Sequence, residues 1–84
     1  MKPITMYTKD YCPYCERAKS FFTSKGWAFT AINLENKPEE FAALKNRTGL
    51  MTVPQIFFGE KLIGGYTDMM AIEREGQLDS LIQD

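Results

Sequence analysis

Strand-like and helix-like stretches alternate along this chain, and that order restricts its fold more than any other feature. Residues 4–8 alternate apolar and polar side chains as a half-buried strand does, and a second strand follows at about 28–33. Between them, 13–25 repeats apolar residues with a helical period, and Gly26 stops the helix. A strand, a helix and a strand in this order predict two parallel, adjacent strands joined by a right-handed crossover.

The second half of the chain continues the alternation and ends its sheet in a hairpin. A second helix is expected from Pro38, which suits a first helical turn, to the residue before Gly49. Residues 54–58 and 61–63 indicate two short strands joined by the tight turn Gly59-Glu60. Two strands separated by so short a turn must be antiparallel, so the sheet is predicted to be mixed.

A third helix is expected over about 68–75, with Thr67 or Asp68 as its cap, and a last helical turn or two over 77–83. The element order is then β-α-β-α-β-β-α. This order predicts an α/β fold with a four-stranded mixed sheet and helices on both faces. A chain of 84 residues leaves room for one domain, spanning 1–84.

Composition excludes several function classes. The net charge of −1 gives no sign of binding to nucleic acid, and no apolar run approaches the ~20 residues of a membrane span. The first residues lack the apolar region of a secretory signal, which favours the cytoplasm. Two cysteines and no histidine are too few for a disulfide scaffold or for a zinc site built from protein ligands alone.

The two cysteines are the strongest candidates for chemistry. Cys12 and Cys15 fall where the first strand gives way to the first helix, which places Cys12 at the N-cap and Cys15 one turn inside. The unpaired N–H groups of a helix start favour a thiolate at Cys12, and Lys9 can add a full positive charge. We therefore expect Cys12 to attack and the more buried Cys15 to resolve. The alternative is a pair of inert core cysteines, but a C-x-x-C in a β-α-β setting indicates redox activity.

These residues also carry a family resemblance. Cys12-Pro13-Tyr14-Cys15 is the motif of dithiol glutaredoxins, and the chain resembles the small bacterial glutaredoxins along nearly its whole length. Thr8-Lys9, Thr52-Val53-Pro54 and the segment from Gly64 to Asp68 match further family segments in order and spacing. The resemblance implies a thioredoxin fold in which Pro54 is cis and faces the cysteines. It further implies a disulfide oxidoreductase that uses glutathione as its reducing co-substrate.

Several residues suit such a ligand. The resemblance implies that the backbone at Val53 pairs with the cysteine of glutathione like an added strand. It also implies that the helix start at Thr67 and Asp68 receives the γ-glutamyl carboxylate, with the Asp68 carboxylate taking the ammonium, although Asp68 as a helix cap alone is the plainer interpretation. The residues implied to bind glutathione are Lys9, Cys12, Tyr14, Thr52, Val53, Pro54, Gly65, Thr67 and Asp68.

Lys9 is expected to meet the glycyl carboxylate, with Lys45 or Arg47 as helpers. In relatives an Arg or Gln often performs this role where the present chain has Leu50-Met51.

The expected activity is reduction of protein disulfides and protein–glutathione mixed disulfides by a monomer with no permanently bound cofactor. A redoxin reduced by thioredoxin reductase is the alternative within the class. The alternative from another class is a dimer that holds a [2Fe–2S] cluster through Cys12 and glutathione, which Pro13 disfavours.

Overall fold

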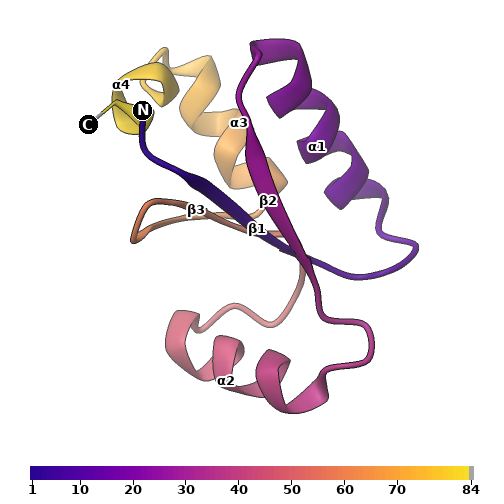
Figure 1. Ribbon diagram of the computed structural model, residues 1–84. Helices are drawn as coiled ribbons and strands as arrows, with labels where there is room; N and C mark the ends of the chain where they lie inside the picture. Colours follow the sequence, from indigo (N-terminus) through magenta and orange to yellow (C-terminus); the bar gives the residue numbers. More distant parts are fainter. Residues whose placement is uncertain (84) are drawn as a thin grey trace.

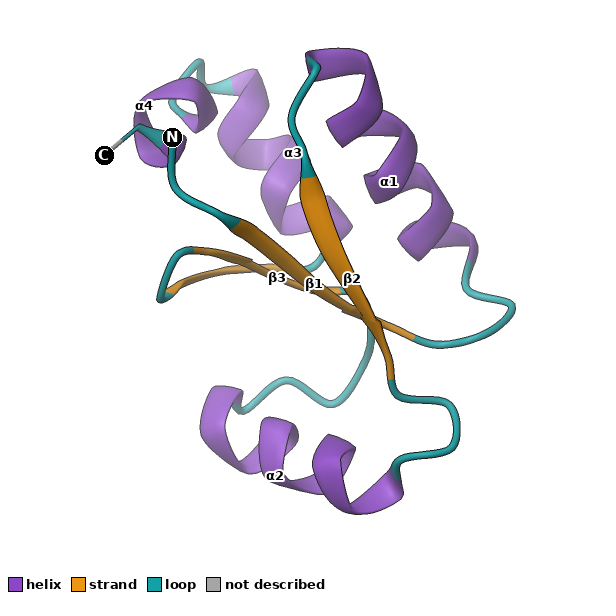
Figure 2. Ribbon diagram, in the orientation of Figure 1, coloured by secondary structure: helices purple, strands orange, loops and turns teal. Residues whose placement is uncertain are grey.

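The fold is a four-stranded sheet between two layers of helices, described for residues 1–83 of a computed structural model (Figures 1 and 2). The sheet order is β2-β1-β3-β4, with β1 and β2 parallel and both other pairs antiparallel. This arrangement confirms the predicted mixed sheet. The elements in chain order are β1 (Ile4–Thr8), α1 (Pro13–Lys25), β2 (Phe29–Asn33), α2 (Pro38–Thr48), β3 (Gln55–Phe58), β4 (Lys61–Gly64), α3 (Tyr66–Arg74) and α4 (Leu78–Ile82).

The core lies between the sheet and the helix layer formed by α1 and α3, while α2 covers the opposite face alone (Figure 1). Along β1, alternate residues are buried on the α1 side, as the strand pattern predicts. The core cluster is apolar and contains residues from most elements: Ile4, Met6, Ala18, Phe22, Ile56, Phe58, Ile63, Met69, Leu78 and Ile82. It fixes the position of α1, and therefore of the cysteines at its start.

The limits of α1 follow from local sequence. Pro13 occupies the first helical position, where its missing N–H costs no hydrogen bond. Gly26 ends the helix in the left-handed conformation, at φ 73°, and its N–H donates to the carbonyl oxygens of Phe22 and Thr23. Both signals were readable from the sequence, and both expectations are confirmed.

The start of α3 corrects the prediction that Thr67 or Asp68 caps it. The helix begins at Tyr66, two residues early, and its N-cap is Gly65. Asp68 is the third helical residue, and its Oδ2 accepts the Gly65 N–H at 2.9 Å. The carboxylate therefore reaches back to the helix start from inside the first turn. An acidic side chain at the third helical position commonly accepts the N–H of the N-cap residue in this way.

The two ends of the described chain lie side by side. The Lys2 N–H donates to the Ile82 carbonyl oxygen at 2.7 Å, and the Gly59 N–H donates to the Pro3 oxygen at 2.7 Å (Figure 1). Both contacts lie at the start of β1, whereas Cys12 follows its other end. No helix within residues 1–83 is long and apolar enough to span a membrane.

An ion cluster joins three helices on the same side of the molecule. The Lys25 ammonium lies 3.0 Å from a Glu73 carboxylate oxygen and 3.3 Å from Asp79. The hydrogen bond with Glu73, together with Asp79, raises the pKa of Lys25 above its ordinary 10.5 against the opposing effect of partial burial. The cluster links the end of α1 to α3 and α4.

Candidate active site

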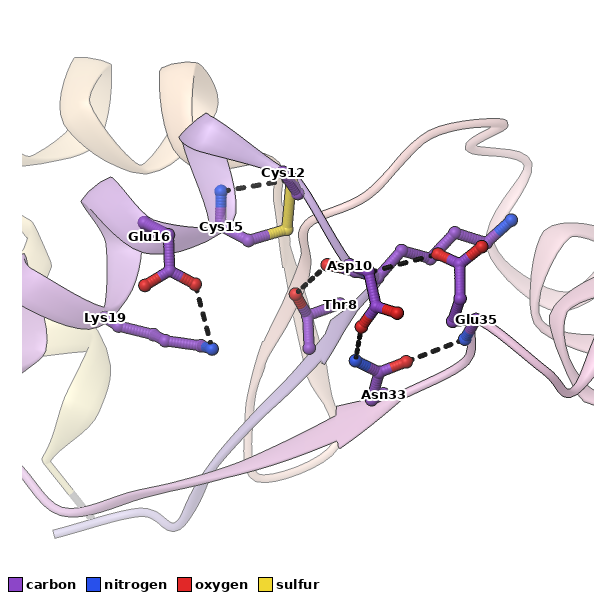
Figure 3. Close-up of polar contacts among 9 residues, drawn as sticks. Thr8, Asp10, Cys12, Cys15, Glu16, Lys19, Asn33 and Glu35 are labelled. Atoms are coloured by element: carbon purple, nitrogen blue, oxygen red, sulfur yellow. Dashed lines mark hydrogen bonds and ion pairs between the residues drawn. A yellow bond between two sulfur atoms is a disulfide. The ribbon is translucent and has the colours of Figure 1, made fainter.

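Cys12 and Cys15 form a disulfide at the start of α1 (Figure 3). Their Cα atoms are 5.2 Å apart, and Cys12 is the N-cap, with its Sγ accepting the Cys15 N–H at 3.2 Å. In the reduced protein that N–H would stabilise a thiolate on Cys12. Cys15 is buried, whereas Cys12 is partly exposed. The predicted difference in burial is confirmed, and it leaves only Cys12 open to an incoming disulfide.

The loop before Cys12 is held by polar contacts with the end of β2 (Figure 3). The Asn33 side-chain amide donates to Asp10 Oδ1 at 2.9 Å, and the Asp10 N–H donates to Glu35 Oε1 at 3.1 Å. Tyr11, which lies between Asp10 and Cys12, has φ 55°. The left-handed conformation costs a non-glycine residue roughly 1–2 kcal/mol. The contacts on both sides of Tyr11 impose it.

The loop that faces Cys12 ends in a cis peptide bond between Val53 and Pro54, as the resemblance implied. The Val53 carbonyl oxygen lies 3.9 Å from Cys12 Sγ. The Val53 N–H has no hydrogen-bond acceptor among residues 1–83. This backbone edge is therefore available to an extended ligand beside the reactive sulfur.

Gln55 holds that loop and was not anticipated from the sequence. Its side chain is buried, and its amide nitrogen donates to the Leu50 and Thr52 carbonyl oxygens, each at 3.0 Å. The Thr48 hydroxyl donates to Gln55 Oε1 at 2.9 Å. A single buried amide thus joins the end of α2 to both ends of the loop. A glutamine directly after the proline is the only sequence signal of this role.

The start of α3 forms the second wall of the site. Gly64 has φ 116°, and a Cβ at this position would lie 2.6 Å from Asp68 Oδ2, so glycine is required for both conformation and space. The N–H groups of Tyr66, Thr67 and Asp68 belong to the first turn, where a helix leaves its donors unpaired. Asp68 is exposed and uses only Oδ2 in its bond to Gly65, which leaves Oδ1 open.

These segments enclose a groove beside the disulfide. Seven of the nine residues predicted for glutathione binding line it, and Tyr66 joins them. The Tyr14 ring stacks on Tyr66 with centroids 5.9 Å apart. The lining residues are Tyr14, Thr52, Val53, Pro54, Gly65, Tyr66, Thr67 and Asp68.

The match to known proteins covers most of the chain. The family model described as Glutaredoxin matches residues 4–63. The chain belongs to the glutaredoxin family. A glutaredoxin of Pseudomonas aeruginosa is 46% identical over 98% of both chains, and glutaredoxin 3 of Escherichia coli is 39% identical over 99% of this chain and all of its own. The crystal structure of a buckwheat glutaredoxin–glutathione complex, 36% identical, has a TM-score of 0.90 and covers 96% of this chain and 76% of its own.

Glutaredoxins are thiol–disulfide oxidoreductases, and the Cys12–Cys15 pair gives this glutaredoxin its dithiol chemistry. A dithiol of this kind reduces a substrate disulfide by two successive exchanges, in which one thiolate forms an S–S bond to one substrate sulfur and releases the other as a thiol. The second thiol of the pair then attacks that mixed disulfide, which releases the second substrate sulfur and leaves the Cys12–Cys15 disulfide seen here. The enzyme therefore alternates between a dithiol and a disulfide.

The three basic residues expected to meet the glycyl carboxylate are not among the lining residues of the groove. The Lys9 ammonium sits over the Phe41 ring of α2, 4.4 Å from its centroid, and the Lys45 ammonium sits 4.6 Å from the same centroid. Neither lysine lines the groove, but the pair concentrates positive charge where β1 meets α2. Arg47 is directed elsewhere: its guanidinium lies over the Phe57 ring at 5.4 Å.

A larger hollow, under α2, is separate from the cysteines. Thr5, Tyr7, Arg47, Phe57 and Leu62 are among its lining residues, and no residue of the Cys12–Cys15 segment is. The groove beside Cys12 is smaller, but its lining residues Tyr14 and Val53 are the ones next to the redox-active sulfur. Within residues 1–83, no group of three or more cysteine, aspartate or glutamate side chains is placed to hold a metal ion.

Proposed function

We propose that this glutaredoxin is reduced by glutathione and acts on protein–glutathione mixed disulfides and protein disulfides. The observation that carries the proposal is the groove next to Cys12, which offers a free backbone edge at Val53 and a helix start at Thr67 and Asp68. Glutathione presents a short extended backbone, two carboxylates and an ammonium. The structurally similar buckwheat protein forms a complex with glutathione.

Each part of the tripeptide has a matching group on the protein. Its cysteine would pair with the Val53 backbone, which brings its sulfur to Cys12. The γ-glutamyl carboxylate would accept from the first-turn N–H groups of α3, and the ammonium would meet the open Oδ1 of Asp68. Tyr14, Thr52, Pro54 and Gly65 would supply the walls.

The glycyl carboxylate would extend from the groove toward the positive charge of Lys9. Lys45 lies over the same Phe41 ring, so its ammonium adds to the positive charge around Lys9. Arg47 lies over the Phe57 ring and lines the separate hollow, which makes it a poor helper for this carboxylate. Of the two helper residues expected from the sequence, Lys45 is therefore the better supported.

The reaction balances with glutathione as the electron donor. The Cys12 thiolate attacks the glutathione sulfur of a protein mixed disulfide, the protein–sulfur bond breaks, and the protein leaves as a thiol after taking a proton. A second glutathione thiolate attacks the glutathione sulfur now bound to Cys12, forming glutathione disulfide and freeing the Cys12 thiolate. Reduction of a protein disulfide requires Cys15 instead, because Cys15 resolves the protein from Cys12.

We further infer that the protein acts as a cytoplasmic monomer, without a permanent cofactor, on proteins that carry disulfides or glutathione. A reactive dithiol is more typical of a reducing compartment than a structural disulfide is. The net charge of −1 favours neither nucleic acid nor an anionic membrane as a partner.

The experiment that tests the proposal compares Cys12→Ser with Cys15→Ser. The probe is the mixed disulfide of glutathione and 2-mercaptoethanol, with glutathione disulfide production coupled to glutathione reductase. Cys12→Ser should lose all activity, whereas Cys15→Ser should keep it, because free glutathione resolves the intermediate. Cys15→Ser should still lose reduction of a protein disulfide.

The wild-type rate should saturate with glutathione. Equal loss in both variants would contradict the roles of the two sulfurs. A rate that is independent of glutathione and supported by thioredoxin reductase would contradict the choice of reductant.

A further inference from the structure

We propose that Tyr11 is a contact residue for the protein substrate, packing against a bulky apolar side chain next to the cysteine that is being reduced. The proposal rests on the proposed function, because the contact forms while Cys12 attacks the substrate. It adds a determinant of specificity outside the groove that the tripeptide would fill.

Folding does not account for a tyrosine at this position. The Tyr11 side chain is fully exposed, and it makes no hydrogen bond, ion pair or ring contact within residues 1–83. Its backbone is left-handed, at φ 55°, a conformation that glycine or asparagine adopts with less strain. A residue that contributes no packing and prefers another backbone conformation is retained more readily for a contact made outside the chain.

The neighbouring residues restrain the backbone of Tyr11. Asp10 is tied to Asn33 and Glu35 at the end of β2, and Cys12 is tied to the first turn of α1 (Figure 3). The single residue between these two anchors has little freedom to move its backbone. The backbone that carries the ring is therefore in place next to Cys12 before any substrate arrives, and less backbone ordering is required when one binds.

The apolar surface around the disulfide extends beyond the groove. Of the four large hydrophobic side chains that are exposed in the described chain, three belong to the two segments that meet at Cys12, namely Tyr11, Tyr14 and Met51. Only Tyr14 lines the groove. Tyr11 and Met51 thus offer apolar area that a tripeptide in the groove would leave uncovered. Aromatic residues exposed in this way are typical of contact sites for other proteins.

The chemistry of the step identifies the partner. When Cys12 attacks the glutathione sulfur, glutathione occupies the groove and the departing sulfur belongs to the protein substrate. The residues on either side of that substrate cysteine therefore lie outside the groove, where the exposed Tyr11 ring is available to them. An apolar substrate side chain there would be removed from water against the Tyr11 ring. The partner is thus an extended protein segment with a bulky apolar residue beside its cysteine.

The test uses two variants and three probes. Tyr11→Asn removes the ring and suits the left-handed backbone, while Tyr11→Phe keeps the ring as the matched control. The probes are a glutathionylated hexapeptide with phenylalanine before its cysteine, the same peptide with serine there, and the mixed disulfide of glutathione and 2-mercaptoethanol. Thermal unfolding of all three proteins is recorded in parallel.

Tyr11→Asn should lower kcat/KM about tenfold for the phenylalanine peptide, as expected for loss of a partly buried aromatic contact. It should change kcat/KM by less than about twofold for the other two probes, because neither has a bulky apolar side chain for the ring to contact. Tyr11→Phe should retain the preference for the phenylalanine peptide. The melting temperature of Tyr11→Asn should equal or exceed that of the wild type.

Two outcomes would overturn the proposal. An equal fall for all three probes would mean that Tyr11 serves the reactive site itself, and no fall for any probe would mean that its ring meets no substrate. Failure of the proposed function would look different, because wild-type activity on the 2-mercaptoethanol probe would then lack saturation with glutathione.

Discussion

Replacing Asp68 by Asn separates its two possible roles at the start of α3. Its Oδ2 accepts the Gly65 N–H at 2.9 Å, so it supports the helix, and its exposed Oδ1 is free to meet an ammonium. Asparagine keeps an oxygen acceptor of the same size and removes the negative charge. Alanine removes both, which makes Asp68→Ala the matched comparison.

The expected magnitudes follow from these contacts. A hydrogen bond to a charged group contributes ~1.5–3 kcal/mol, but an exposed pair contributes less, so we expect the ammonium contact to be worth about 1–1.5 kcal/mol. Catalytic efficiency toward glutathione mixed disulfides should then fall about fivefold to tenfold in both variants. Stability should respond differently. Loss of charge near the helix start costs roughly 0.5 kcal/mol, or about 2–4 °C in Tm, while alanine also loses a hydrogen bond and should lower Tm by about 4–8 °C more.

The assay is the glutathione-coupled reduction used for the cysteine variants, with Tm followed by circular dichroism. If Asp68→Asn keeps wild-type efficiency while Asp68→Ala melts earlier, the carboxylate supports the helix only. The glutathione assignment would then depend on the Val53 backbone and Lys9.

Two further predictions concern the scaffold of the site. Gly64→Ala should lower the free energy of unfolding by about 1–3 kcal/mol, because residue 64 has φ 116° and the new Cβ would collide with Asp68 Oδ2. It should also lower catalytic efficiency, because the Asp68 carboxylate would be displaced. Urea titration measures the first effect, and the control is Gly65→Ala, whose Cβ would lie at an ordinary 3.6 Å from the Pro54 oxygen; equal destabilisation by both would refute the steric argument. Lys25→Met should lower Tm at pH 7. The folded-state pKa of Lys25 is raised above 10.5, chiefly by its hydrogen bond to Glu73, so the stability gained is present below 10.5 and is lost as pH rises through the folded value. A Tm difference that does not begin to shrink as pH rises above 10.5 would contradict the ion cluster.

The features that were predictable from the sequence are those with a local cause. Pro13 and Gly26 set the limits of α1 through backbone preferences that involve no distant residue. The spacing of Cys12 and Cys15 likewise places both sulfurs on one turn of that helix, with Cys15 buried. The cis bond before Pro54 had no such local cause, and only the family resemblance implied it.

The features that were missed depend on residues brought together by the fold. Gln55 holds the loop before Pro54 through partners up to seven positions away, which a periodic pattern does not reveal. The contacts of Asp10 with Asn33 and Glu35 require β1 and β2 to be paired first. The prediction that Thr67 or Asp68 is the N-cap of α3 was wrong for a related reason. Its residue type favours an N-cap, but here it acts from the third helical position, where Gly64 leaves room for its carboxylate.

The meeting of the chain ends has a practical consequence for attaching other domains. Lys2 and Ile82 are hydrogen-bonded to each other at the start of β1, and Cys12 follows its opposite end. A carrier protein fused at either end would therefore sit about one strand length, roughly 17 Å, from the reactive sulfur. A short peptide linking the two ends would need to cross little distance, so new termini opened elsewhere on the surface are compatible with this architecture. Such termini are best kept away from the loop of Glu35, because its carboxylate accepts the Asp10 N–H beside the Cys12 segment.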